Sequence, residues 1–408
     1  MANIGMVLDS FYPEDGRVTK EATSLKAAGH EVYLICLQRV GEKRTETLEV
    51  LTVYRIPVLF PKVSLPAYEF LTATLRIHPL FRQHLPKFIK AYCIDVLHVH
   101  DLPLAATCRT AATTDGIPWV LDLHENYPAG LQVWSIHKTG FLQSLKRGWL
   151  YNYNTWSRYE RKMIHAANHV IGVVEEMKLR LVRNYRLNQS KISVVTNSEW
   201  RNFFDQFELQ ESILSTYPSE FVILYLGYFG PHRGVDTVIK AMPGILKEVP
   251  NARFVIVGRG SVQAQYEALA SKLGVNDQVT FLGFKPYREV GSWMTRADVN
   301  IVPHKRNEHT DHTIPHKLFQ SMLSGRPTVV SSSPPLARIA LETGGALVFE
   351  AESPSSVVAC ISDLFHNVSL RQETVRKALT ATKSGSYNWD SDSDNLVQVY
   401  KSLGLGVN

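Results

Sequence analysis

The sequence lacks the features that mark membrane-spanning and secreted proteins. It contains no run of 18 apolar residues, and neither a basic leader nor a small-residue cleavage site precedes the apolar stretch from Ile4 to Leu8. Its four cysteines are scattered, with no spacing typical of a zinc site or a disulfide framework. We therefore expect a cytoplasmic protein without a transmembrane helix.

The charge of the chain is unevenly distributed. The formal net charge is +6, and the excess of Lys and Arg lies in the first 200 residues. No helix-turn-helix, zinc-finger or aromatic RNA-binding signature accompanies it, so we do not expect nucleic acid as a partner. An anionic membrane surface suits the basic half better.

Short apolar runs alternate with longer helical patterns twice along the 408 residues, which is typical of parallel sheets wrapped by helices. Because one hydrophobic core rarely serves a chain of this length, we expect two α/β domains, with a linker within residues 197–220. The predicted strands are residues 4–8, 32–37, 50–56, 96–99, 119–123, 169–174 and 192–196 in the first half, and 221–226, 253–257, 279–282, 299–302, 328–330 and 346–349 in the second.

Residues 312–327 predict a polar loop, an amphipathic helix and a strand. Thr313 and Pro315 are the candidate cap and first-turn residues, and Gly325 is expected to end the helix. A helix that begins here would point free N–H groups, the positive end of its dipole and Lys317 at an anion. We interpret this segment as a phosphate site.

Several motifs, in order, resemble those of the family-four retaining glycosyltransferases of the GT-B fold, in the branch with an Asp-x-His-Glu motif. The resemblance covers nearly the whole chain. It implies two Rossmann-like, doubly wound parallel-sheet domains that face each other across a cleft: residues 1–200, completed by a terminal helix of about 388–408, and residues 201–387. The similar segments are Asp15–Val18, Asp95–Asp101, Pro118–Glu125, Lys191–Asn197, Gly227–Gly234 and Pro315–Met322.

The resemblance implies a nucleoside diphosphate sugar as donor, bound by the second domain, and no cofactor. Without a metal, the diphosphate leaving group must be neutralised by fixed cations and N–H donors. Arg233 and Lys317 would supply the charge, and His124 would approach the donor sugar. The other donor-binding candidates are Gly16, Gly227, Tyr228, Gly258, Phe284, His312, Thr313, Ile314, Pro315 and Gln320.

The chain departs from the family pattern at three of these positions. His312 and Gln320 replace a pair of Glu residues, of which the second would bind the nucleotide ribose, and Tyr228 replaces a frequent Arg. Gln320 can still hydrogen-bond ribose hydroxyls, although less strongly than a carboxylate would. Glu308 is a candidate to compensate for the missing Glu at position 312.

The acceptor is expected in the first domain. Arg17, His100, Asp101 and Glu125 are the candidate acceptor-binding residues, each near the end of a predicted strand or in the first loop. None of the nearby carboxylates is singled out as a general base.

Aromatic and basic residues alternate through residues 65–90 and 134–162. Such mixtures suit an anionic lipid interface. The alternative is a set of helices that pack on the domain core with a solvated basic face.

Together these features predict a hexosyltransferase that moves a sugar from a UDP- or GDP-sugar, with retention, to a glycan or lipid-linked acceptor. The enzyme would act in cell-surface polysaccharide biosynthesis. It would be a peripheral protein on the cytoplasmic face of the membrane. Three other functions stay open: a glycan-binding pseudoenzyme, a nucleotide-sugar epimerase and, least favoured, a carbohydrate phosphorylase.

Overall fold

The computed structural model describes residues 1–58, 61–135 and 150–405. The chain divides into an amino-terminal unit, Met1–Thr196 with Asp392–Asn408, and a carboxyl-terminal unit, Asn197–Ser391. Sequence analysis placed the first boundary four residues later, at 200/201, and the start of the returning helix at about 388. None of the described helices is long and apolar enough to cross a membrane.

An eight-stranded sheet forms the centre of the amino-terminal unit, in the order β3-β4-β2-β1-β5-β6-β7-β8. All neighbours pair in parallel except β3 and β4. The seven predicted strands of this half are confirmed. The strands are β1 (Asn3–Phe11), β2 (Glu31–Gln38), β3 (Thr45–Thr47), β4 (Thr52–Pro57), β5 (Val96–His100), β6 (Trp119–Leu123), β7 (His169–Gly172) and β8 (Ile192–Val194).

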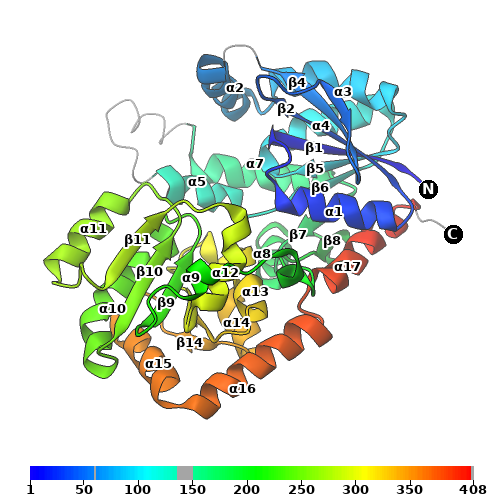
Figure 1. The fold of residues 1–408 in the computed structure, drawn as a ribbon. Coiled ribbons are helices and arrows are strands. Elements are labelled where there is room, and N and C mark those ends of the chain that lie inside the picture. Colours follow the sequence, from blue (N-terminus) through cyan, green and yellow to red (C-terminus); the bar gives the residue numbers. More distant parts are fainter. Residues whose placement is uncertain (59–60, 136–149, 406–408) are drawn as a thin grey trace. The chain divides into compact units, whose positions relative to one another are not determined.

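Helices cover both faces of this sheet (Figure 1), which explains why β5 and β6 are buried along their whole length. The helices are α1 (Gly16–Ala27), α2 (Pro61–Leu75), α3 (Pro79–Ala91), α4 (Ala105–Asp115), α5 (Tyr127–Ser135), α7 (Tyr153–Ala166), α8 (Glu175–Tyr185) and α17 (Trp389–Ser402). From Asp392 onward α17 belongs to this unit, and the buried Tyr400 hydroxyl lies 2.6 Å from Nδ1 of His98 in β5.

The carboxyl-terminal unit contains a six-stranded, fully parallel sheet in the order β11-β10-β9-β12-β13-β14. Its six predicted strands are confirmed: β9 (Phe221–Leu226), β10 (Ala252–Val257), β11 (Val279–Gly283), β12 (Val299–Val302), β13 (Thr328–Ser331) and β14 (Leu347–Phe349). The helices of the unit are α9 (Glu211–Leu214), α10 (Val235–Glu248), α11 (Gln263–Lys272), α12 (Val290–Arg296), α13 (His316–Leu323), α14 (Pro334–Thr343), α15 (Pro354–His366) and α16 (Val368–Leu379).

Each sheet has a point at which the strand order reverses. In the amino-terminal unit it lies between β1 and β5, and in the carboxyl-terminal unit between β9 and β12. Loops that leave the carboxyl ends of such strands diverge to opposite sides, which opens a crevice for a ligand. The functional residues of each unit are therefore to be sought after these four strands.

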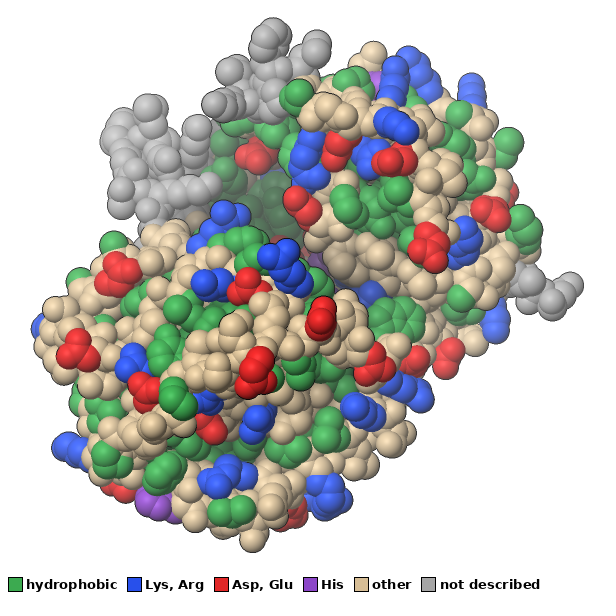
Figure 2. Space-filling model, in the orientation of Figure 1, with side chains coloured by type: hydrophobic (Ala, Val, Ile, Leu, Met, Phe, Trp, Pro, Cys, Tyr) green, Lys and Arg blue, Asp and Glu red, His purple; other side chains and the backbone are tan. Residues whose placement is uncertain are grey.

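The basic and aromatic segments predicted to meet a membrane pack largely inward. Phe81, Phe88 and Trp156 are buried, whereas Phe70 and Leu75 of α2 are 41% and 61% exposed. The exposed basic residues of α3 and α7 are Arg82, Lys87, Lys90, Arg158, Arg161 and Lys162. In the view of Figure 2, Lys and Arg side chains are interspersed with Asp and Glu. Residues 136–149 of the predicted patch lie outside the described residues.

The polar patch Asp390–Asp394 lies at the start of α17. Asp390 pairs with Arg201 within the carboxyl-terminal unit, and Asp392 Oδ1 accepts a hydrogen bond from the Thr196 N–H within the amino-terminal unit. Asp390 and Asp392 therefore each have a partner within one unit.

An ion pair joins α7 to α8 in the core of the amino-terminal unit. The two Nη atoms of Arg180 bond the Glu160 carboxylate, at 2.9 and 2.7 Å, and Tyr185 donates a third hydrogen bond to it, at 2.8 Å. Both charged side chains are almost fully buried. Removing one charge of such a pair leaves the other without compensation in the interior.

We expect Glu160→Gln to lower the free energy of unfolding by about 3–5 kcal/mol, measured by urea unfolding followed by circular dichroism. Glu373→Gln, which removes an exposed pair with Lys377 on α16, is the control and should leave the unfolding midpoint unchanged. Equal midpoints for both variants would contradict a structural role for the buried pair.

Candidate functional site

The loop after β9 approaches the neighbouring loops so closely that it requires glycine. A Cβ atom on Gly258 would lie 2.1 Å from the Gly227 carbonyl oxygen, and one on Gly234 would lie 1.7 Å from the Pro303 carbonyl oxygen. All three glycines have positive φ. Gly227 and Gly258, predicted to bind the donor, thus bring the ends of β9 and β10 into backbone contact.

Arg233 and Lys317 come together at this crevice. Lys317 Nζ donates to the Tyr225 hydroxyl at 2.9 Å and lies 4.0 Å from the centre of the Tyr225 ring. Arg233 Nη1 lies 3.0 Å from Nε2 of His304, which follows β12. In the part of the chain that the structure describes, neither cation pairs with a carboxylate.

Two basic side chains without a carboxylate partner among the described residues suit the binding of an anion. Burial, and then the positive charge of Arg233, hold the pKa of Lys317 well below its ordinary value. Burial, and then Arg233, also depress the pKa of His304, so that its imidazole is neutral. An entering anion would favour the charged form of Lys317, and its binding is therefore coupled to proton uptake when Lys317 is neutral in the free protein.

The helix that carries Lys317 begins later than expected. Pro315 is the N-cap of α13 and makes no side-chain capping bond, while Thr313 lies outside the helix in an extended conformation. The prediction of Thr313 as cap and Pro315 as first-turn residue is wrong, because proline sets the chain extended up to the helix start. The predicted amphipathic character of this helix is confirmed, because Leu318, Phe319 and Met322 are buried on it.

A carboxylate stands beside the position predicted to bind ribose. Gln320 Nε2 donates to Glu199 Oε1 at 2.8 Å, and His316 Nδ1 lies 3.6 Å from the same oxygen. Sequence analysis missed Glu199, because it lies 121 residues earlier in the chain. His312 Nδ1 lies 2.8 Å from the Glu308 carbonyl oxygen and 3.6 Å from its carboxylate, so these two are neighbours as anticipated.

The remaining donor-binding candidates differ in exposure. Tyr228 and Phe284 are 56% and 69% exposed, and the Arg259 guanidinium lies 5.4 Å from the centre of the Phe284 ring. Ile314 is buried, and its carbonyl accepts a hydrogen bond from Asn197. Gly16 begins α1, where a Cβ atom would meet nothing within 4 Å. Their contacts with a donor stay predictions.

In the amino-terminal unit, Arg17 is the centre of a buried ionic network. Its guanidinium donates hydrogen bonds to both oxygens of Asp122, at 3.0 and 2.9 Å, and to the Val195 carbonyl, at 3.0 Å, and its Nε forms an ion pair with Glu21 Oε1 at 2.9 Å. The side chain is only 2% exposed. The prediction that Arg17 binds an acceptor is therefore corrected: its cation is directed into the core, where it positions Asp122.

Glu21, His98, His100 and Asp122 form a buried group whose ligand atoms lie within 4.8 Å of one another. The cation that compensates these carboxylates is Arg17, and burial followed by Asp122 raises the pKa of Glu21 well above its ordinary range. Sequence analysis recognised neither Glu21 nor His98, because both lie within a helix or a strand rather than at its end.

His124 lies at the edge of this network, 16% exposed. Its Nε2 lies 2.9 Å from Asp122 Oδ2 and 3.1 Å from Nδ1 of His100, and its Nδ1 lies 3.6 Å from Asp101. Burial opposes a charge here, but Asp101 and Asp122 outweigh it and raise the pKa of His124 to about 10. Burial lowers the pKa of the neighbouring His100 to about 3. His124 is therefore a fixed imidazolium at neutral pH.

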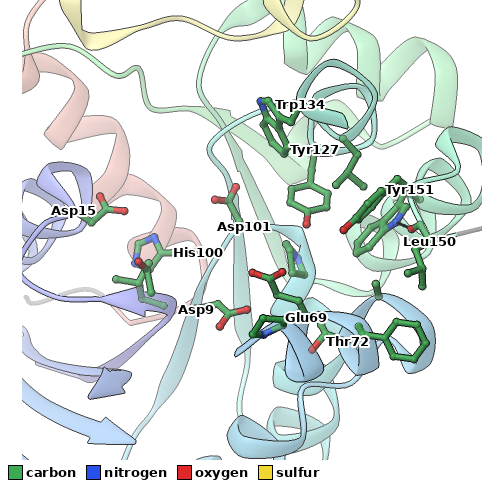
Figure 3. A pocket seen from close by; sticks show the side chains of 18 residues that line it. Asp9, Asp15, Glu69, Thr72, His100, Asp101, Tyr127, Trp134, Leu150 and Tyr151 are labelled. Carbon is green, nitrogen blue, oxygen red and sulfur yellow. Dashed lines mark hydrogen bonds between the residues drawn. The ribbon is translucent and has the colours of Figure 1, made fainter. Parts of the chain in front are cut away.

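A cavity of about 570 Å³ opens beside His100 and Asp101 at the switch point between β1 and β5 (Figure 3). Asp101 has φ 65° and ψ 161°, a conformation that costs roughly 1–3 kcal/mol for a residue with a side chain and that occurs mainly at functional sites. Of the predicted acceptor-binding residues, His100 and Asp101 line this cavity, whereas Glu125 and Arg17 lie outside its lining. Sequence analysis missed Asp9, Glu69 and Tyr127, which also line it.

The two halves of the chain each match a known protein family. Residues 17–198 match the Glycosyltransferase Family 4 model, and residues 206–380 match the Glycosyl transferases group 1 model. The chain therefore combines a domain that matches each of these two glycosyltransferase families.

Individual proteins are similar over nearly the whole length. An uncharacterised glycosyltransferase of Methanocaldococcus jannaschii is 25% identical over 93% of this chain and 92% of its own. The phosphatidyl-myo-inositol mannosyltransferase of Mycolicibacterium smegmatis is 23% identical over 99% and 95%. Among solved structures, the sucrose-phosphate synthase of Thermosynechococcus elongatus has a TM-score of 0.75 at 15% identity, covering 99% of each chain. Anabaena HepE in complex with UDP-glucose has a TM-score of 0.70 at 12% identity, covering 98% of this chain and 100% of its own.

The charge of His124 can be tested by titration. Because its pKa is raised on folding, the stabilisation from its ion pairs is complete below its unfolded pKa of about 6.5 and is lost as the pH rises through about 10. We expect no titration of His124 between about pH 5 and about pH 9 in histidine NMR spectra assigned with His124→Gln. Asp101→Asn should bring its titration into this range, whereas Asp95→Asn, outside the network, should not. An unchanged titration in Asp101→Asn would refute the ion-pair explanation.

Proposed function

We propose that the protein is a retaining hexosyltransferase that uses a UDP- or GDP-sugar and acts on a glycan or lipid-linked acceptor in cell-surface polysaccharide biosynthesis. The observation that carries this proposal is the Arg233 and Lys317 pair, whose cations lack a carboxylate partner among the described residues. A pyrophosphate supplies the negative charge that this pair lacks. Fixed cations stabilise a diphosphate most at the moment its bond to the sugar breaks.

The proposed reaction exchanges one bond for another on the same face of the sugar. The bond from the anomeric carbon to the diphosphate breaks, and a bond from that carbon to an acceptor oxygen forms. The acceptor proton passes to the leaving phosphate oxygen, so that no side-chain base is required. In this scheme Arg233 and Lys317 hold the leaving group without a metal ion, and His124 donates a hydrogen bond from its charged imidazole to the sugar.

Two comparisons support the choice of substrates. The similar mannosyltransferase of M. smegmatis is named for a phosphatidylinositol acceptor, and HepE, which is similar in fold, was solved with UDP-glucose. We propose that the chain acts in the cytoplasm and is peripheral on the membrane. Phe70 and Leu75 would be the apolar contacts, flanked by the exposed basic residues of α3.

The donor site is tested by nucleotide binding. Wild-type protein, Arg233→Ala and Lys317→Met are titrated calorimetrically and by thermal shift with UDP, GDP, ADP and CMP. We expect one nucleotide to raise the melting temperature of the wild type by mass action and to bind each variant at least about tenfold more weakly. Lys317→Met should not lower the melting temperature of the free protein, because it removes a desolvated charge.

Lys240→Met is the matched control, since it removes a half-exposed lysine of the same unit that pairs with Asp236. It should leave nucleotide affinity unchanged. Absence of a response of the wild type to any of the four nucleotides would refute the transferase proposal and favour a glycan-binding pseudoenzyme.

Turnover tests metal independence and stereochemistry. With the nucleotide so identified, sugar transfer to a lipid extract is followed in excess chelator, and the anomeric configuration of the product is read by NMR. We expect undiminished turnover and the configuration of the donor. Loss of turnover in chelator would refute metal independence, an inverted product would refute retention, and conversion of the free nucleotide sugar without an acceptor would favour an epimerase.

A further inference from the structure

The cavity of the amino-terminal unit is strongly acidic. Of its described lining residues, four are carboxylates and none is Lys or Arg, and the histidine among them, His100, is neutral because burial lowers its pKa to about 3. The carboxylates are Asp9, Asp15, Glu69 and Asp101. A neutral sugar does not by itself require so much charge of one sign.

Two of the four carboxylates already have partners. Asp15 accepts hydrogen bonds from the backbone N–H groups of Arg17 and Val18 as the N-cap of α1, and Asp101 faces the imidazolium of His124. Their charges therefore contribute little to the binding of a further cation.

Asp9 and Glu69 are not compensated in this way. The ionisable partner of Asp9 is His78, 3.5 Å away, whose pKa burial lowers to about 4, so that it is neutral. In residues 1–58, 61–135 and 150–405, no hydrogen bond or ion pair to the Glu69 carboxylate is present. Burial, and then the charge of Glu69, raise the pKa of Asp9 to about 7. The two carboxylates therefore repel each other, and a cation between them would relieve the repulsion.

The rest of the wall suits an organic cation. Tyr127, Trp134 and Tyr151 line the cavity with aromatic side chains, which attract ammonium groups and stack on the apolar faces of sugars. Trp156 also lines it, but its ring is buried and already carries the Arg76 guanidinium, 3.8 Å from the ring centre. In Figure 3 the Tyr127 hydroxyl and the Glu69 and Asp9 carboxylates surround the same space.

Two polar atoms of the wall have no partner. Oγ1 of Thr72 and Nε2 of His100 are buried, on side chains that are at least 96% buried, and neither has a hydrogen-bond partner in the described structure. Buried polar groups are rarely left unpaired, so these two atoms are unsatisfied in the free protein.

We propose that this cavity binds an acceptor that carries a protonated amine next to hydroxyl groups, such as an amino sugar or an amino alcohol head group. The ammonium lies between Asp9 and Glu69, and the aromatic side chains enclose the carbon skeleton. This assignment rests on the proposed transferase function and specifies its acceptor. It also places any phosphate of a lipid-linked acceptor outside the cavity, because the carboxylates would repel it.

Calorimetry without nucleotide tests the proposal on the intact chain. The probes are 2-aminoethyl glucoside, its isostere 2-hydroxyethyl glucoside, and 2-phosphoethyl glucoside, which share one sugar and differ in charge. We expect the amine to bind at least about tenfold more tightly than the hydroxyl probe and the phosphate to bind most weakly. Equal affinity for the amine and hydroxyl probes would overturn the proposal, and so would displacement of the amine by Mg²⁺ or Ca²⁺ at lower concentration.

Glu69→Gln provides the decisive variant, because it removes the charge and keeps the shape at an exposed position of α2. The preference for the amine should fall to about threefold or less, with the melting temperature unchanged. Glu49→Gln, an exposed carboxylate outside the lining, should keep the full preference. An undiminished preference in Glu69→Gln would overturn the assignment.

Failure of this inference is distinguishable from failure of the transferase proposal. If nucleotide binding and turnover hold while the amine shows no preference, the acceptor assignment alone is wrong. If the amine binds and no nucleotide does, the cavity remains an amine site in a protein that is not a transferase.

Discussion

The bidentate bond between Arg17 and Asp122 is the interaction on which the amino-terminal unit depends. One guanidinium, contributed by α1, neutralises Asp122 of β6 and bonds the backbone after β8, so that it connects three elements far apart in the sequence. Burial alone would raise the pKa of Asp122, but Arg17 and then His124 hold it well below its ordinary value. A permanently ionised Asp122 in turn keeps His124 charged. The protonation state of the partly buried His124 therefore depends, through Asp122, on the buried cation of Arg17.

The two switch points differ in electrostatic character although the two sheets share a topology. At the crevice after β9 and β12, Arg233 and Lys317 have no carboxylate partner among the described residues, whereas the cavity beside β1 and β5 has four carboxylates and neither Lys nor Arg in its described lining. The fold opens a crevice at each reversal of strand order, but the residues of the loops determine the charge of that crevice. The proposed transfer requires crevices of opposite charge, because the leaving diphosphate is anionic while the acceptor is proposed to be cationic.

Both sites retain charge that a purely structural protein would neutralise. Lys317 lies beside Arg233 without a carboxylate partner among the described residues, Asp9 lies close to Glu69, and Asp101 adopts a left-handed φ. Each arrangement costs stability in the free protein, and a ligand of the opposite charge would relieve the first two. Such residues contrast with the pair of Glu160 and Arg180, in which each charge is fully compensated and no ligand is needed.

The sequence by itself determined the thirteen main strands, the two-domain architecture and the cations of the second site, because apolar periodicity and strand-end motifs are local patterns. It did not reveal β3, whose Thr-Glu-Thr has no apolar alternation. Only the tertiary structure decided that Arg17 is an internal counter-ion, that Glu199 stands beside Gln320, and that Asp9 and Glu69 share one cavity. The physical reason is that charge compensation acts through space. Partners separated by 60 to 121 residues leave no periodic signal in the sequence. Whether a carboxylate is neutralised depends on which side chains the fold brings within a few ångströms of it.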